Sequence, residues 1–301
     1  PGCDHESLDR AGMLGESLPN NMSVSSPVPD APLLLLQDRE AFRRHVARHG
    51  PPDSAYFVRQ AEALVQAGRQ DPLPVVAMAE ALVEQARAGG RGEDLAVALR
   101  ARGNLAFLCA DYARAVEDYR AALEGFGGDE VERGRTLSSL LHPLAMLGDH
   151  EASLAAAEEA RGCFARAGDR RRLARLEINL ASVWFREDKF HETLAAIERA
   201  EAGLKTCDPQ QEDTEAWAAI RVTRAVVLIN LTRFEEAERA YEEARDYARG
   251  QGMLGLAAQA EYNIGYLYFL RGQHVQAIHA LDQARETARA GGDKLHLALC
   301  D

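Results

Sequence analysis

The chain has 301 residues and a formal net charge of −12 at pH 7, with 47 acidic and 35 basic side chains. This acidic balance argues against nucleic-acid binding, which usually requires a basic stripe, and it fits a neutral or basic partner. The five cysteines are widely spaced and odd in number, which is neither a disulfide framework nor a zinc pattern, so we expect a cytoplasmic location. Because no apolar run approaches the roughly 18 residues of a spanning helix, we expect no membrane partner.

The N-terminal part of the chain divides into two predicted segments. Residues 1–32 contain five prolines and few apolar side chains, a composition that predicts a disordered tail. Residues 33–53 place Leu35, Leu36, Phe42 and Val46 toward one side of a short amphipathic helix. Such a helix has two interpretations, a cap over the first helical hairpin or a segment that docks a partner, and the cap is favoured.

Residues 54–301 are predicted to form a serial array of two-helix units. The first unit, 54–89, is degenerate, as terminal repeats are expected to be because one face meets solvent. Each clear unit is read as helix, turn and helix, and glycine followed by an acidic residue between units is typical of a helix end and a new helix start. The clear units are 92–127, 130–168, 170–206, 212–250 and 253–291, and residues 293–301 begin a further one.

The repeat is defined by one large residue after the turn inside each unit, which we call the anchor. The separations between anchors are 38, 40, 44 and 40 residues, and the anchors are Tyr112, His150, Phe190, Phe234 and His274. Three residues after each anchor stands a small residue, and ten residues after it stands an alanine: Ala122, Ala160, Ala200, Ala244 and Ala284. Small side chains at a helix crossing permit a close approach of the two helix axes.

This arrangement resembles the tetratricopeptide repeat (TPR), in which a small residue lies on the first helix, an aromatic follows the turn and alanines lie on the second helix. The usual TPR period is 34 residues, so these are long repeats, with helices extended by roughly one turn. The resemblance implies an all-α fold, an α-solenoid in which TPR-like helical hairpins form a right-handed superhelix. It also implies a concave groove, lined by the first helix of each hairpin, that binds a protein or peptide.

The groove positions implied by the resemblance are polar or aromatic in several repeats. Side-chain amides can hydrogen-bond an extended peptide, and aromatics supply contact area. A structural alternative stays open, because Asn179 and Asn263 share one repeat position at which an amide can bond the neighbouring helix. The candidate binding residues are Arg100, Asn104, Ser138, His142, Asn179, Ser182, Thr223, Tyr262, Asn263 and Tyr266.

The chain lacks the sequence motifs of a serine nucleophile, a phosphate loop, a zinc peptidase or a dinucleotide site. We therefore expect no catalytic residue, no metal and no cofactor within these residues. Cys163 near His150 or His191 is better explained as a small buried hydrophobe than as a nucleophile. The basic run 170–172 with Arg175 is more typical of a solvated helix face than of a contact with an acidic partner.

A second resemblance concerns the amino-acid sequences of the linkers and of stretches within the repeats. The linkers 167–171 and 291–294 and the stretches 260–272 and 297–301 look like those of bacterial proteins in which long repeats precede a CHAT domain, a caspase-like cysteine peptidase module. The half-repeat 293–301 also suggests a piece of a longer protein. The main hypothesis is a non-catalytic scaffold for protein interaction. The alternative is the regulatory or sensor arm of a CHAT-type peptidase with its catalytic domain downstream in the same chain.

Overall fold

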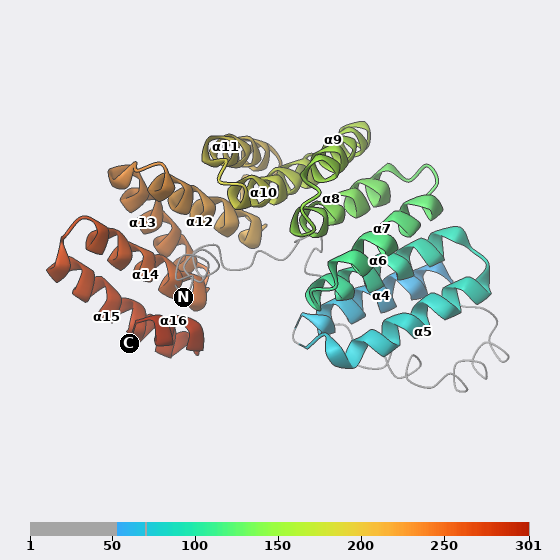
Figure 1. Cartoon of the computed structure of the whole chain (residues 1–301), viewed down its shortest axis with the longest axis horizontal. Coiled ribbons are helices and arrows are strands. Elements are labelled where there is room, and N and C mark those ends of the chain that lie inside the picture. The colour runs from blue at the N-terminus through green and yellow to red at the C-terminus, as the bar shows by residue number, and fades with distance from the viewer. Residues whose placement is uncertain (1–52, 70, 301) are drawn as a thin grey trace. The chain divides into compact units, whose positions relative to one another are not determined.

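The computed structural model describes residues 53–69 and 71–300, and these fold into thirteen helices with no β-strand among them (Figure 1). The all-α prediction is therefore confirmed. The expected tail, 1–32, and all of the expected capping helix except Asp53 lie outside the described residues. Within the described ranges, no helix combines the length and the apolar character needed to cross a membrane.

The helices form antiparallel hairpins, and we call the first helix of each hairpin its A helix and the second its B helix. The A helices are α4 (Ser54–Gly68), α6 (Gly92–Leu108), α8 (Glu130–Met146), α10 (Arg170–Arg186), α12 (Thr214–Asn230) and α14 (Leu254–Leu270). The B helices are α5 (Leu73–Gly89), α7 (Tyr112–Gly125), α9 (His150–Arg166), α11 (Phe190–Cys207), α13 (Phe234–Gly250) and α15 (His274–Gly291). The short helix α16 (Lys294–Leu299) follows α15.

From α7 onward, each B helix begins at the anchor residue that the sequence pattern selects. The residue two places before every anchor has a left-handed backbone, with φ between 57° and 80°. Glycine is the residue best suited to this conformation, and it occupies the position in two hairpins. The others carry an L side chain there. The five residues are Ala110, Gly148, Asp188, Thr232 and Gly272.

The two helices of a hairpin pack closely because small residues face large ones. A Cβ built on Gly103 of α6 would lie 2.8 Å from the Tyr119 ring of α7, and a Cβ on Gly265 of α14 would lie 2.9 Å from Cγ of Leu281 of α15. Any larger residue at these glycines would therefore push the pair apart. The alanines ten places after the anchors are all buried, as a helix crossing requires.

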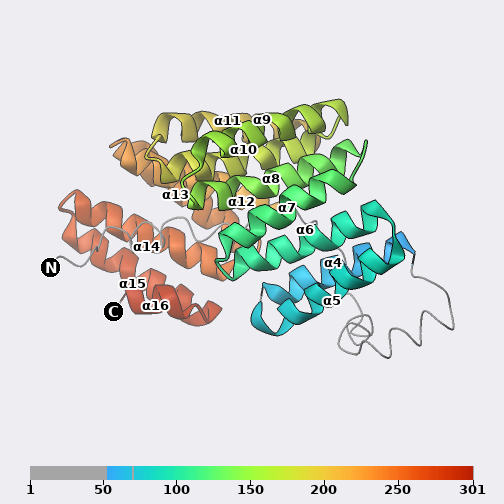
Figure 2. The same cartoon turned by 45° about the vertical axis from the view of Figure 1, so that its right-hand side comes forward.

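The chain divides into two compact units, and the division falls inside α10 between Asn179 and Leu180. In the N-terminal unit, which ends at Asn179, α4 lies beside α6, and α6 contacts α8, so that successive A helices are neighbours (Figure 2). In the C-terminal unit, which begins at Leu180, α12 to α16 pack on one another in chain order. Each unit builds its core from neighbouring hairpins, the pattern of repeat proteins.

Candidate binding pocket on the A helices

A pocket of about 280 Å³ opens in the N-terminal unit between three successive A helices, α4, α6 and α8. Its lining residues recur at spacings of three and four along each helix, so that one face of each helix turns toward the same space. On α6, for example, Glu93, Val97, Arg100 and Asn104 all line the pocket. The A-helix face that the sequence analysis selected for binding therefore contains a formed cavity in this unit.

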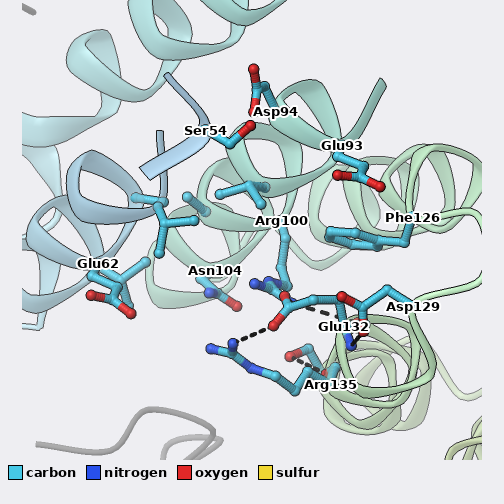
Figure 3. A pocket seen from close by; sticks show the side chains of 16 residues that line it. Ser54, Glu62, Glu93, Asp94, Arg100, Asn104, Phe126, Asp129, Glu132 and Arg135 are labelled. Carbon is cyan, nitrogen blue, oxygen red and sulfur yellow. Dashed lines mark hydrogen bonds and ion pairs between the residues drawn. The ribbon is translucent and has the colours of Figure 1, made fainter. Parts of the chain in front are cut away.

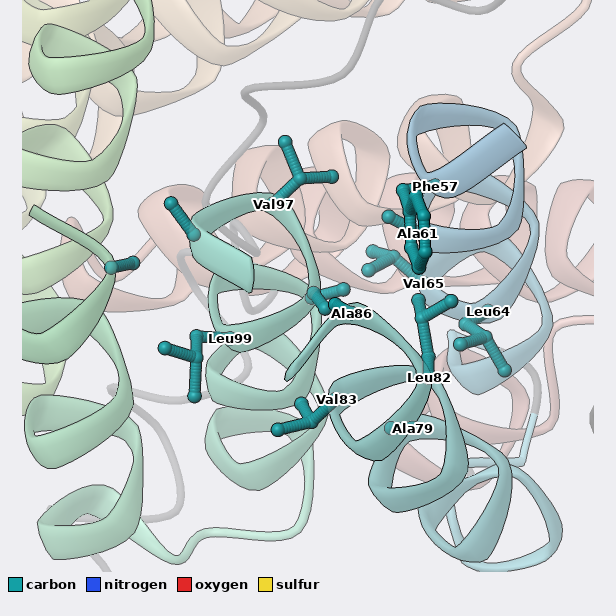
Figure 4. Close-up of a cluster of buried hydrophobic side chains, with 14 of the residues drawn as sticks. Phe57, Ala61, Leu64, Val65, Ala79, Leu82, Val83, Ala86, Val97 and Leu99 are labelled. Carbon is teal, nitrogen blue, oxygen red and sulfur yellow. The ribbon is translucent and has the colours of Figure 1, made fainter. Parts of the chain in front are cut away.

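The apolar wall of the pocket is part of the hydrophobic core. Ala61 and Val65 of α4 and Val97 of α6 line the pocket and also belong to the buried cluster that contains Phe57 and Leu82. Figure 4 shows Phe57, Ala61 and Val65 close together near Leu82, with Val97 on the neighbouring helix. Because the core fixes them, the wall is held in place before any ligand arrives, which lowers the entropic cost of binding.

The charged centre of the pocket is a three-residue cluster of Arg100, Glu132 and Arg135. The Glu132 carboxylate pairs with Nη1 of Arg100 through one oxygen and with Nη1 of Arg135 through the other, the second pair at 2.6 Å. Both arginines are directed at this one carboxylate (Figure 3). All three side chains are largely removed from solvent, so each interaction is screened less than a surface ion pair.

Burial and the neighbouring charges shift the pKa values of Arg100 and Glu132. Burial lowers the pKa of Arg100 to about 10, and the positive charge of Arg135 acts in the same direction. Burial opposes ionisation of Glu132, but the charges of Arg100 and Arg135 outweigh it and hold the pKa of that carboxyl below its usual value. The Arg100 guanidinium also lies 5.2 Å from the centre of the Phe126 ring, a cation–π contact. At neutral pH the cluster is therefore two cations that share one anion.

Asn104 supplies a neutral polar group beside this cluster. The hydroxyl of the buried Tyr119 donates a hydrogen bond of 2.7 Å to Oδ1 of Asn104. This bond fixes which end of the amide is the acceptor, and it leaves the Nδ2 hydrogens to serve another acceptor. Such an amide suits a carbonyl of a bound peptide backbone.

Four further carboxylates line the pocket. Two of them have structural tasks, because Asp94 pairs with Arg91 and Asp129 caps α8 by accepting bonds from its first N–H groups. The other two, Glu62 of α4 and Glu93 of α6, have no hydrogen-bond or ion-pair partner among the described residues. They lie on opposite sides of Arg100 in the view of Figure 3.

Of the ten residues predicted from sequence, Arg100 and Asn104 line this pocket. The structure places the other predicted residues of the N-terminal unit in buried surroundings. Ser138 and Asn179 are buried and bond each other, since Nδ2 of Asn179 donates to Oγ of Ser138 at 3.1 Å. This bond is the structural alternative that the sequence left open for Asn179. His142 is buried against Phe107, with 6.3 Å between the ring centres.

The predicted residues of the C-terminal unit differ in exposure. Tyr262 and Tyr266 are half-buried, and Tyr262 packs against the ring of His296. Three more are buried: Ser182, Thr223 and Asn263. The side-chain amide of Asn263, which is 0% exposed, has no hydrogen-bond partner among the described residues. Asn179 and Asn263 are equivalent in the repeat, but the position of Ser138 is taken by the apolar Val222 in the repeat before Asn263.

Four further lining residues of the pocket are not among those predicted from sequence: Glu62, Glu93, Glu132 and Arg135. Charged side chains on a helix are usually solvated, so their identity alone does not mark a site. A usable signal is the spacing of Glu132 and Arg135, three residues apart on an A helix, where opposite charges can pair on one face.

Comparisons with known proteins establish the fold. No protein-family model matches the chain, and no curated protein sequence matches it. Among solved structures, the Rap protein complexed with Competence and Sporulation Factor is similar with a TM-score of 0.62 and 16% identity, over 89% of this chain and 77% of that chain. NprR in complex with its cognate peptide NprX is similar with a TM-score of 0.53 and 12% identity, over 90% and 79% of the two chains.

A third similar structure is the STAND protein with a tetratricopeptide repeat sensor from Pyrococcus horikoshii. Its TM-score is 0.60 and its identity 11%, over 87% of this chain and 41% of that chain. Identities this low show the fold alone. The chain therefore has the fold of TPR-like helical repeat proteins, α-solenoids built from stacked hairpins.

Proposed function

We propose that this protein is a non-catalytic interaction scaffold that binds a peptide or an extended protein segment on its A helices. The observation that carries the proposal is the pocket between α4, α6 and α8, in which an apolar wall surrounds a small set of fixed polar groups. Binding sites in proteins commonly have this composition, because apolar contact supplies affinity and a few polar groups supply orientation.

The size of the pocket is compatible with part of a longer segment. Its volume of about 280 Å³ is near the lower end of the usual range for ligand pockets, roughly 300–1,000 Å³. It suits one or two side chains of a longer ligand whose backbone continues along the A helices. The Nδ2 group of Asn104 can donate to a carbonyl of such a backbone. The peptide complexes among the similar structures, such as NprR with NprX, support the same class of ligand.

Blocking the pocket mouth tests this proposal. Val58 lines the pocket and is 41% exposed, so Val58→Trp fills the opening without disturbing the core. Val275→Trp is the matched control, because Val275 is an exposed valine on a helix of the other unit. We expect binding to a degenerate pool of fluorescein-labelled short peptides, followed by anisotropy, to fall about tenfold or more in Val58→Trp only. Equal binding by both variants would place the ligand elsewhere.

We infer a second candidate function, that of a sensor arm for a CHAT-type peptidase domain. It rests on the linker and repeat sequences described above. In that case the long repeats of TPR type bind the effector, and the catalytic residues lie beyond residue 301. Sequencing the gene downstream of codon 301 tests this function. A stop codon there, or a downstream domain without a His and Cys pair, would remove it.

A further inference from the structure

The charge of the pocket carries an inference about the ligand, and this inference rests on the proposed function. The two guanidiniums of the pocket are already engaged, because Arg100 and Arg135 both pair with Glu132. A carboxylate of a ligand would have to displace Glu132 from both arginines. The Glu132 carboxylate would then lack an ionic partner, as those of Glu62 and Glu93 already do. The structure therefore disfavours an acidic group at the centre of the pocket.

The remaining charge of the pocket is negative. Glu62 and Glu93 line the pocket and have no ionic partner among the described residues. With Asp129 and Glu132 they make four carboxylates against two guanidiniums, once the internal pair of Asp94 with Arg91 is set aside. The excess agrees in sign with the net charge of the whole chain, −12, which attracts cationic segments at long range.

The position of Glu62 suits an ion pair with a lysine or arginine side chain of the ligand. Glu62 follows Ala61 directly, and the next residue on the same face of α4 is Val65, so that Glu62 borders the apolar wall. Lysine and arginine carry a long apolar stem that can lie on such a wall while the charged end reaches a carboxylate. A glutamine or leucine would satisfy the stem contact alone.

We propose that the ligand segment inserts a lysine or arginine side chain that pairs with Glu62 or Glu93, and that Glu132 excludes acidic segments by occupying Arg100 and Arg135. Glu132 is thus a specificity-determining residue. Its carboxylate does not hold the ligand; it removes the attraction that two guanidiniums would otherwise exert on anions. Replacing Glu132 should change the preferred ligand charge, whereas replacing Glu62 and Glu93 should remove the preference for a cation.

The test uses three pools of fluorescein-labelled degenerate peptides with the central position fixed as Lys, Gln or Glu, and anisotropy with the whole chain. For the unmodified protein we expect the Lys pool to bind about threefold to tenfold more tightly than the Glu pool at low salt. Glu62→Gln with Glu93→Gln should equalise the Lys and Gln pools. Glu132→Gln should tighten the Glu pool by about threefold to tenfold. Added salt should reduce each difference.

Two exposed glutamates of the same unit that do not line the pocket, Glu124 and Glu151, provide the control. Their double change to glutamine alters the net charge as much as the Glu62 and Glu93 pair and should leave the Lys preference intact. Far-UV circular dichroism checks that every variant is folded. If Glu132→Gln does not fold, the Glu62 and Glu93 variant decides the proposal by itself.

The outcomes separate the two proposals. If no pool binds, or if Val58→Trp leaves binding unchanged, the proposed function fails. If pools bind and Val58→Trp abolishes binding, but the Glu pool binds as tightly as the Lys pool, the function stands and the charge preference is overturned. A Lys preference that is lost equally in the Glu124 and Glu151 control would also overturn it, because the net charge would then explain the effect.

Discussion

Tyr119 and Tyr241 allow the role of one buried hydroxyl to be tested at two equivalent positions. Each stands seven residues after its anchor on a B helix, and each is 0% exposed. The Tyr119 hydroxyl donates to Asn104 at 2.7 Å, whereas the Tyr241 hydroxyl has no hydrogen-bond partner among the described residues. The residue equivalent to Asn104 in the repeat of Tyr241 is Val226, which offers no acceptor.

The two tyrosines should therefore respond oppositely to replacement by phenylalanine. Tyr119→Phe removes a hydrogen bond, so it should lower the free energy of unfolding by about 1 kcal/mol, the usual net value of such a bond. Tyr241→Phe removes a hydroxyl that is desolvated without compensation, so it should raise the free energy of unfolding by about 1 kcal/mol. The ring packing is unchanged in both variants, which makes the pair a matched comparison.

Urea unfolding measures both effects. The two tryptophans of the chain, Trp184 and Trp217, lie in the C-terminal unit, so their fluorescence reports the Tyr241 variant directly. Far-UV circular dichroism follows the Tyr119 variant. The midpoint should shift without a change in the denaturant slope. A Tyr241→Phe midpoint as low as that of Tyr119→Phe would refute the reasoning, because it would mean that the Tyr241 hydroxyl has a partner such as a buried water.

Three further predictions concern the C-terminal unit. Thr232→Gly should raise the free energy of unfolding by about 1 kcal/mol, because Thr232 holds an L side chain at φ 57°; a lower urea midpoint would contradict this. Asp208→Asn should cost about 1–3 kcal/mol, because its carboxylate accepts bonds from N–H groups of Glu212 and Asp213 and from Nε1 of Trp217; tryptophan fluorescence in urea measures the loss, and an unchanged midpoint would refute it. Burial raises the pKa of Tyr241 above its usual value, so its titration does not affect the free energy of unfolding below about pH 10, the unfolded pKa, and lowers that free energy as the pH rises above it. Between about pH 9 and about pH 11, on either side of the unfolded pKa, the urea midpoint should fall less steeply with pH in Tyr241→Phe than in the unmodified chain. Equal slopes of midpoint against pH would contradict a raised pKa for Tyr241.

The hairpin architecture could be predicted because its determinants are local and periodic. The anchors and the alanines ten places on repeat at nearly constant spacing, and the structure begins a helix at each anchor from Tyr112 to His274. The left-handed turns at Ala110 and Thr232 could not be predicted in the same way. Neither residue favours that conformation by itself, and each turn is closed by backbone bonds, from the N–H of Asp111 to the carbonyl of Ala106 and from the N–H of Arg233 to the carbonyl of Leu228.

The pocket could be predicted only in part. Arg100 and Asn104 were found because the TPR resemblance marks the A-helix face. Glu132 and Arg135 were missed because their burial depends on α6 and α8 meeting, and a single sequence does not show that contact. The predicted amides diverge for a related reason. Asn179 donates a hydrogen bond to Ser138 of the preceding repeat. In the repeat that precedes Asn263, the position equivalent to Ser138 is occupied by Val222.

The bond from Asn179 to Ser138 joins two hairpins, and this limits how freely such modules can be exchanged. A hairpin whose side-chain amide donates a hydrogen bond to the preceding hairpin requires an acceptor on that preceding hairpin. Duplicating or transplanting a unit therefore creates or abolishes polar pairs at the new junction, even when every apolar contact is kept. A chimera that places hairpin 130–168 directly ahead of hairpin 253–291 would present a serine to Asn263, and such junctions should be the easiest to recombine.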